Sequence, residues 1–435
     1  MKHTVTEIKL RNGAKGLIIH IPDATVMNFV FNFRAGEYLL DAQKWETAHL
    51  MEHVLLGANE RLPKARLFQA EIERNGAYSN ASTGVYDINY EAECADFEWD
   101  RILDLMHVAI TKPLFLEDEF EAEFGNVKEE LVVRSNNNFR HLNLALHEKY
   151  GFLAKTDQER AKLMKNVTLQ DVCAHYKRTH STRNMRFIVA GNLTPGRQET
   201  IKDLLEKFDL PLGKNRFDLP DERPKQQEKP LYIFNKSVKN VYFYLDTFMN
   251  RRLTDEESDA LSLANTMLTE TLYSKIFGTA RERGLVYGMS SGFSQTKLTS
   301  NWWFGAQVSR KNVGSLFEII SDEISKLFRG EIDAEDIEAA KAYSLGRFQR
   351  SAQTVGGTAG GYGRYFFDEV IDDYYLIPKR IKAVTKAQIV KISQEMFAEK
   401  IWGIGTLTSC DKQIASDLQT QISPLWQTDA VADKK

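Results

Sequence analysis

The order of helical and strand-like segments is nearly the same in the two halves of this 435-residue chain. In each half a strand is followed by a helix, then by further strands and helices, and a last strand returns late. A repeated order of elements predicts a repeated fold, because each repeat must bury its own apolar faces. The mixture of helices and strands in each repeat predicts the α+β class.

The segments follow from the period of their apolar residues, which is two in strands and about 3.6 in helices. In the first half, the predicted strands are 26–34, 77–92 and 185–190, and the predicted helices are 47–56, 99–110 and 117–133. In the second half, the predicted strands are 241–246, 286–294, 302–309 and 401–406, and the predicted helices are 255–276, 313–328 and 334–349. We therefore predict two homologous domains, each a largely antiparallel sheet packed with helices.

A charged connector separates the two halves. Residues 213–230 read G-K-N-R-F-D-L-P-D-E-R-P-K-Q-Q-E-K-P, and this composition favours an exposed, extended segment. The predicted domains are therefore 1–212 and 231–435, and residues 424–435 are predicted to be a frayed tail. The glycine-rich segment 354–365 lacks the G-K-[S/T] ending of a phosphate loop, so we predict a flexible connection between helices there.

Composition narrows the class of protein. The 57 basic and 60 acidic residues nearly balance, which argues against a strongly basic nucleic-acid-binding protein. The three cysteines are too few and too widely spaced for a disulfide framework, and they fit a reducing compartment. No stretch approaches the roughly 18 apolar residues that cross a membrane, and the N-terminus lacks an apolar signal region. We expect a soluble cytoplasmic protein, or a mature chain whose leader has been removed.

The sequence H-L-M-E-H at 49–53 is the strongest chemical signal, and all nine histidines lie in the first 180 residues. On a helix, His49 and His53 share one face and can bind a single ion, and Glu52 borders that face. This is the reversed zincin arrangement, H-x-x-E-H, in which two imidazoles bind zinc and the carboxylate carries the proton. A catalytic zinc site also needs a third protein ligand from elsewhere in the chain.

The alternative for this motif is a surface helix with two incidental histidines. Apolar neighbours such as Leu50, Met51 and Val54 argue against it, because they predict a buried helix whose polar side chains need partners. A metal ion would be such a partner.

Several segments together resemble the insulinase/pitrilysin family of zinc metallopeptidases, which includes the mitochondrial processing peptidases. They are the H-L-M-E-H helix, N-G-A-Y-S-N-A-S-T at 75–83, E-F-G-N-V-K-E-E at 123–130, N-M-R-F-I-V-A-G-N at 184–192 and R-E-R-G-L-V-Y at 281–287. The match runs over nearly the whole chain. The resemblance implies an endopeptidase that binds one Zn²⁺ per chain, with Glu52 activating the water that attacks a peptide carbonyl.

The third zinc ligand is also implied by the resemblance. It is a glutamate about 77 residues after the second histidine, preceded seven residues earlier by another glutamate, and here these positions are Glu130 and Glu123. Glu130 is then the ligand, and Glu123 is a candidate for orienting a ligand. Glu129 is a competitor, but it lies about 100° around the helix from Glu130. Taken alone, this acidic helix could equally be a solvated face.

Substrate-binding residues are likewise implied by the resemblance. Asn80 and Ala81 lie on a predicted edge strand, to which a peptide would pair through its backbone, although an ordinary strand with a polar face is the alternative. Tyr287 and Arg281 would bind and polarise the substrate carbonyl. Arg281 is six residues before the tyrosine, whereas the usual position is seven before and is here Ala280, so a surface charge is the alternative for Arg281.

The second half lacks the zinc-binding residues, because Ser262, Asn265 and Thr266 align with the histidines and glutamate of the motif. The resemblance implies a dimer, in which two chains form a closed chamber that admits peptides and unfolded segments. One chain holds both sets of residues, which favours a homodimer, and a heterodimer with a related subunit stays open. The alternatives in function are a non-catalytic or partner-dependent subunit of a heterodimeric processing peptidase and a metal-dependent hydrolase of another small substrate.

Overall fold

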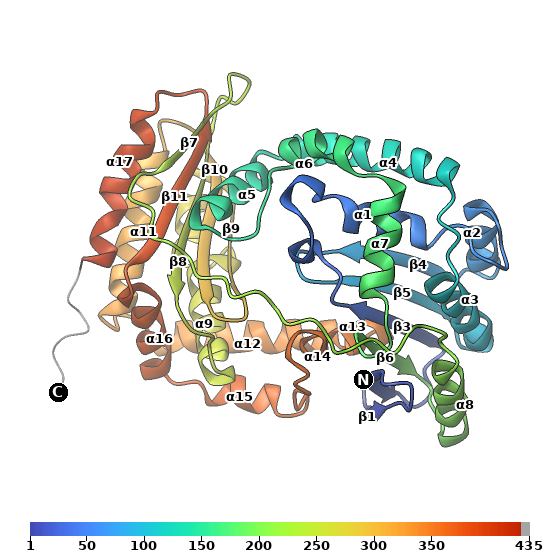
Figure 1. The fold of residues 1–435 in the computed structure, drawn as a ribbon. Coiled ribbons are helices and arrows are strands. Elements are labelled where there is room, and N and C mark those ends of the chain that lie inside the picture. Colours follow the sequence, from blue (N-terminus) through green and yellow to red (C-terminus); the bar gives the residue numbers. More distant parts are fainter. Residues whose placement is uncertain (428–435) are drawn as a thin grey trace. The chain divides into compact units, whose positions relative to one another are not determined.

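The computed structural model describes residues 1–427, which form two compact units (Figure 1). Unit 1 contains Met1–Val133, Asp157–Leu219 and Gln349–Tyr374, and unit 2 contains Arg134–Thr156, Pro220–Phe348 and the described residues from Tyr375 onward. Each unit therefore includes one segment from the other half of the sequence. A single domain boundary within 213–230 cannot account for these two exchanged segments. Residues 213–230 themselves contain no helix or strand, as expected for a connector.

The sheet of unit 1 has six strands in the order β1-β2-β6-β3-β5-β4. The strands are β1 (Thr4–Lys9), β2 (Lys15–His20), β3 (Val26–Phe33), β4 (Tyr78–Thr83), β5 (Ile88–Ala95) and β6 (Met185–Gly191). Neighbouring strands are antiparallel except β2 and β6, which are parallel. Strand β4 lies at the edge, so one side of its backbone is not paired within this sheet.

Successive residues of β3 point to opposite faces of this sheet, and helices pack against both faces. Phe29, Phe31 and Phe33 are fully buried in a core shared with α1 (Thr47–Leu55), α3 (Trp99–Thr111) and α7 (Leu169–Thr179). Asn28 and Val30 point to the other face, where α13 (Val355–Gly360) packs against β3 and β6 (Figure 1). The remaining helices are α2 (Ala65–Glu73), α4 (Glu117–Ser135), α6 (Asp157–Leu163), α8 (Pro195–Glu206) and α14 (Arg364–Asp368).

The sheet of unit 2 has five strands in the order β7-β11-β8-β10-β9. They are β7 (Leu231–Phe234), β8 (Val241–Met249), β9 (Val286–Gln295), β10 (Ser300–Val308) and β11 (Ile401–Thr408), and only the β7–β11 pair is parallel among them. One face packs on α9 (Asp255–Asn265), α11 (Val313–Phe328), α16 (Lys386–Ala398) and α17 (Gln413–Ile422), and the other packs on α5 (Asn138–Tyr150). The other helices are α10 (Phe277–Glu282), α12 (Ala334–Ser351) and α15 (Ile377–Ala383).

The predicted α+β class and the two helix-packed sheets are confirmed. The order β2-β6-β3-β5-β4 in unit 1 corresponds to β7-β11-β8-β10-β9 in unit 2, including the position of the single parallel pair. The predicted helix 255–276 is too long, because α9 ends at Asn265 and a π-helical turn follows over Thr266–Glu270. The Thr269 hydroxyl donates to the Asn265 carbonyl there, and such a bond competes with regular helical pairing.

Two segments predicted to lack structure are ordered by packing. Residues 424–426 belong to a 3₁₀ turn in which Trp426 stacks on Trp402 with ring centroids 4.1 Å apart and donates to the Thr247 hydroxyl at 3.0 Å. The rest of the predicted tail, 428–435, lies outside the described residues. The glycine-rich segment is not a flexible connection, because it forms α13, where the Thr354 side chain accepts a hydrogen bond from Gly357 N at 2.9 Å.

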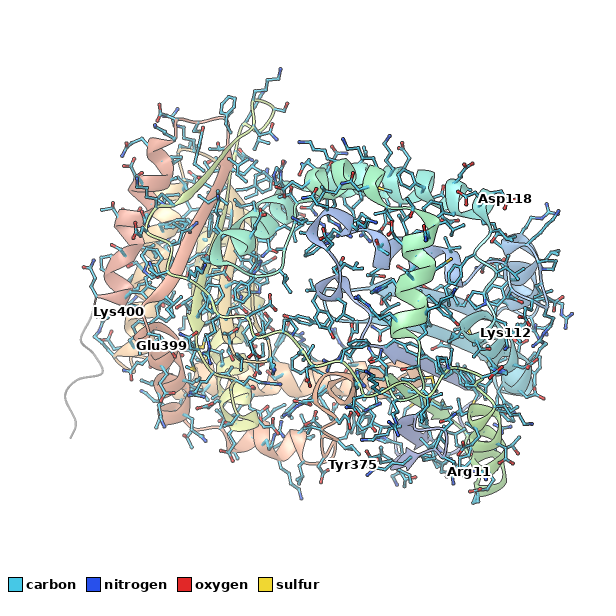
Figure 2. The ribbon with its side chains drawn as sticks, viewed as in Figure 1. Arg11, Lys112, Asp118, Tyr375, Glu399 and Lys400 are labelled. Carbon is cyan, nitrogen blue, oxygen red and sulfur yellow. The ribbon has the colours of Figure 1, made fainter. Side chains whose placement is uncertain are left out.

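Charged side chains such as Arg11 and Asp118 lie at the surface of unit 1 (Figure 2). Within residues 1–427, no helix combines the length and the apolar character that crossing a bilayer requires.

Candidate metal site and substrate edge

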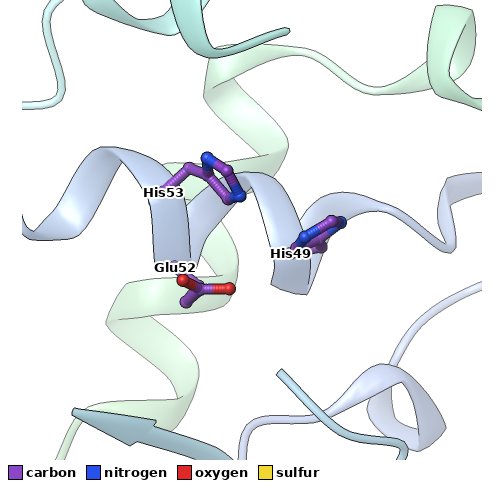
Figure 3. Close-up of side chains that lie close together, drawn as sticks. All are labelled: His49, Glu52 and His53. Atoms are coloured by element: carbon purple, nitrogen blue, oxygen red, sulfur yellow. The ribbon is translucent and has the colours of Figure 1, made fainter. Parts of the chain in front are cut away.

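Helix α1 carries the three residues of the H-x-x-E-H motif. Leu50, Met51 and Val54 pack into the core of unit 1, and this anchors the helix against the sheet. The donor atoms of the motif residues lie within 4.8 Å of one another, and Figure 3 shows the three side chains on neighbouring turns of the helix. The helix therefore brings the imidazoles and the carboxylate together without any contribution from loops.

Glu130 on α4 completes this cluster. Its Oε2 atom lies 3.2 Å from Nε2 of His49 and 3.6 Å from Nε2 of His53. A single carboxylate oxygen thus faces the ε nitrogen of both histidines. Glu129 is exposed on the same helix, consistent with its different direction. The geometry brings Glu130, and not Glu129, to the motif.

The δ nitrogens of the two histidines face other carboxylates. Glu123 lies 2.9 Å from Nδ1 of His53, as its predicted role in orienting a ligand requires. Glu46 lies 3.0 Å from Nδ1 of His49, is fully buried, and was not identified from the sequence. Its position one turn before the first histidine is the signal that could have revealed it. Both imidazoles are therefore held so that their ε nitrogens converge on Glu130.

Glu46 is itself fixed by a buried arginine on α6. Arg160 donates to the two carboxylate oxygens of Glu46 at 2.5 and 3.1 Å, which is bidentate pairing. The Arg160 guanidinium also lies 3.4 Å from Glu37. Nothing in the sequence near Arg160 indicates this role, because the pair joins residues that are 114 positions apart.

The surrounding carboxylates raise the pKa of both histidines. Burial alone lowers the pKa of His53, but hydrogen bonds with Glu123 and Glu130 outweigh burial and raise it to about 10. Burial likewise opposes protonation of His49, and Glu130 and Glu46 raise its pKa above the usual value. An imidazole must be neutral to bind a metal ion, and the raised pKa values oppose this form. Metal affinity should therefore rise with pH.

Glu52 borders the cluster and also contacts the edge strand. Burial raises its pKa, and the Thr83 hydroxyl at the end of β4 donates to its Oε2 atom at 3.2 Å. Ala81 packs against the core on the same face of β4 as Thr83, whereas Asn80 alternates to the opposite face and is exposed. Of the two predicted substrate-binding residues, Ala81 therefore faces the side of the sheet that carries Glu52.

The donor set fits zinc. Two imidazole nitrogens and one carboxylate oxygen are the ligands of many catalytic zinc sites, which leave a further position open. Each metal-binding imidazole usually has its other nitrogen held by a carboxylate or carbonyl, as Glu46 and Glu123 hold these. His49, His53 and Glu130 would hold the ion.

Arg281 and Tyr287 lie together in unit 2. The Arg281 guanidinium is 4.4 Å from the centre of the Tyr287 ring and donates to the Tyr287 carbonyl. The tyrosine side chain is 86% exposed, while Ala280 is fully buried. The side chain at position 281 therefore lies beside the tyrosine. A side chain at position 280, the usual position of the arginine, points into the core instead.

Two family models match the chain in tandem. Residues 43–159 match the model described as insulinase, peptidase family M16, and residues 166–343 match the model of the peptidase M16 inactive domain. The chain belongs to the insulinase family, M16. The first match contains the H-x-x-E-H helix and Glu130, and the second contains Arg281 and Tyr287.

Relatives of this M16 chain include the insulin-degrading enzyme of Drosophila melanogaster, which is 26% identical over 218 residues, 48% of this chain. The chain spans only 22% of the length of that enzyme. A protease from Helicobacter pylori has a similar structure, with a TM-score of 0.82, 19% identity and coverage of 94% of this chain and 100% of that one. A peptidase M16 inactive domain from Pseudomonas fluorescens has a TM-score of 0.83, 18% identity and coverage of 94% and 99%. These two structures establish the shared fold.

Proposed function

We propose that this protein is a zinc-dependent endopeptidase that cleaves peptides or unfolded segments of polypeptides. The observation that carries the proposal is the convergence of Nε2 of His49 and Nε2 of His53 on one oxygen of Glu130, with Glu52 beside them. Membership of the M16 family supports the same activity.

Zinc at this site would act as a Lewis acid toward the peptide carbonyl and make water easier to deprotonate. The residues of the chain would supply the remaining chemistry. Glu52 would take a proton from the attacking water and later give it to the leaving amine, and its raised pKa suits both steps. Thr83 would keep the Glu52 carboxylate turned toward the end of β4.

The substrate would bind as an additional strand on β4. The edge of this strand is free within the sheet, and Ala81 and Thr83 face the side that carries Glu52. Backbone pairing of this kind depends little on side chains, so it suits varied peptides. We further propose that two chains associate as a homodimer that encloses the sites, and that Arg281 and Tyr287 bind the substrate carbonyl.

The decisive experiment measures the turnover of quenched fluorescent unstructured peptides together with the zinc content of the protein. We expect wild type to bind one zinc per chain and to cleave, and Glu52→Gln to keep zinc but lose activity by about 10² to 10⁴-fold. Glu73→Gln, at an exposed glutamate on α2, is the matched control and should behave as wild type. A wild type that does not bind zinc would overturn the proposal.

The alternative is a partner-dependent subunit of a heterodimeric processing peptidase. A zinc-loaded protein that cleaves no peptide alone, and gains activity when a related subunit is added, would establish that alternative.

A further inference from the structure

A cavity of about 490 Å³ lies in unit 1 on the face of the sheet opposite α1. Its walls come from β3, β4, β5 and β6 on one side and from α13 with the residues that follow it on the other. Tyr78 and Ser82 of β4 line the cavity. They point to the face opposite that of Ala81 and Thr83, which lie on the side of Glu52. The edge strand therefore has the candidate metal site on one face and this cavity on the other.

The cavity carries negative charge without a matching cation. Glu91 and Glu93 of β5 are its only charged residues among those that the structure describes. Asn28 is 7% exposed, and its side-chain oxygen has no hydrogen-bond partner within residues 1–427. A buried acceptor without a donor is costly, so Asn28 is suited to a ligand that donates hydrogen bonds. Val30 and Ile188 add apolar surface for an aliphatic chain.

Small residues on α13 keep this space open. A Cβ atom at Gly356 would lie 3.1 Å from the Glu93 carboxylate and 3.7 Å from the Asn28 amide nitrogen. Gly360 and Gly363 also line the cavity. A side chain at Gly356 would thus crowd the two polar groups that the cavity presents.

We propose that this cavity binds the lysine or arginine side chain of a peptide paired with β4, an inference that rests on the proposed peptidase function. In the sheet, Asn80 pairs with Glu91 and Tyr78 pairs with Glu93, so both carboxylates lie one strand inside the edge. An added strand would lie about 10 Å from β5, at two strand spacings. A long basic side chain of the peptide and a glutamate side chain of β5 together span this distance.

The alternation of strands makes the inference specific. Successive residues of an added strand point to opposite faces, so only every second residue of the substrate can reach the cavity. The intervening residues lie on the face of Glu52. A preference for a basic residue should therefore have a period of two along the peptide.

The test is a scan of quenched fluorescent peptides in which lysine, norleucine or glutamate occupies each position in turn. With wild type, we expect lysine to raise kcat/KM over norleucine by about 10- to 100-fold at positions of one parity only, as charge-assisted hydrogen bonds would. Glu91→Gln/Glu93→Gln should lose this preference while it cleaves the norleucine peptides as wild type does. Glu73→Gln, at an exposed glutamate of α2 that does not line the cavity, should keep it.

The outcomes separate the two proposals. If zinc-loaded wild type cleaves none of the peptides, the proposed function fails, and this inference fails with it. If wild type cleaves the peptides with no periodic lysine preference, or if the double variant keeps the preference, only the cavity inference fails. Binding of an uncleaved lysine peptide to Glu52→Gln, with and without Glu91→Gln/Glu93→Gln, gives a second readout. Equal affinity of the two proteins for this peptide would overturn the inference.

Discussion

Helices α1 and α9 occupy the same place in their two units, each after the strand at the middle of its sheet, but they hold different polar clusters. On α1, Glu52 accepts from Thr83 of the edge strand β4. On α9, Asn265 accepts from Ser291 of the edge strand β9 at 2.7 Å and from the Trp302 indole at 2.9 Å. The side-chain oxygen of Asn265 is satisfied by hydrogen bonds from within the protein. In unit 1, by contrast, the ε nitrogens of both histidines converge on one oxygen of Glu130. The same framework thus carries a candidate ligand site in one unit and a structural network in the other.

The opposite faces of the two sheets also differ. In unit 2, α5 packs closely on the strands, so that a Cβ atom at Gly403 would lie 2.7 Å from the Tyr150 ring. Here the glycines belong to the sheet and the large side chains belong to the helix. In unit 1 the arrangement is reversed, because the glycines belong to α13 and the polar side chains belong to the strands. As a result, this face of the sheet is filled by side chains in unit 2 and has a cavity in unit 1.

The largest expected effect tests whether the cluster in unit 1 is a metal site. Glu130→Gln should abolish stable zinc binding and lower kcat/KM by about a thousandfold, because zinc supplies several kcal/mol of stabilisation in the transition state. Zinc content and peptide turnover measure this. Glu129→Gln, on the same helix but exposed, should change neither. Equal loss in both variants would show that the helix, and not the carboxylate of Glu130, matters.

The counterpart in unit 2 should respond in stability and not in zinc binding. Asn265→Ala leaves the Trp302 indole and the Ser291 hydroxyl without their acceptor, so we expect a loss of about 2 to 3 kcal/mol in the free energy of unfolding. Urea denaturation measures the loss, and zinc content should stay at wild-type level. Ser262→Ala on the same helix is the control. A variant as stable as wild type would contradict the structural role of Asn265.

The next prediction concerns Glu46, the buried carboxylate that contacts His49 in unit 1. Glu46→Gln should weaken zinc binding by about 10- to 100-fold, since an orienting carboxylate fixes the direction of the imidazole of His49. Competition with a chromophoric chelator measures the affinity, and Asp41→Asn, at an exposed residue near the start of the same segment, serves as control. An unchanged affinity would show that packing alone orients His49.

The last prediction concerns how stability depends on pH through a buried carboxylate in unit 2. Burial raises the pKa of Asp246 to about 8, whereas an unfolded chain loses this proton near pH 4. Between these values the folded state holds more protons, so stability should fall as pH rises, and the penalty is complete above pH 8. Asp246→Asn should remove that dependence, so its stability relative to wild type should rise as the pH rises from 5 to 8. Thermal unfolding at pH 5 and pH 8 measures the difference, and parallel pH profiles of the two proteins would contradict it.

Much of this architecture could be predicted from local pattern. The alternating residues of β3 and the helical period of α1 predict elements whose observed limits are Val26–Phe33 and Thr47–Leu55. These predictions succeeded because the apolar period of a segment reports directly which face is buried. The segment that became α13 was misjudged, because glycine favours a loop until a neighbouring sheet selects a short helix.

The sequence by itself determined the two repeats, the M16 family and the positions of His49, Glu52 and His53, because spacing along one helix fixes which side chains share a face. Only the tertiary structure decided that Glu46 and Arg160 support the site, and that 134–156 and 349–374 each join the unit of the other half. These features depend on contacts between residues far apart in the chain. Local periodicity carries no information about such contacts, since they arise only when separate elements pack.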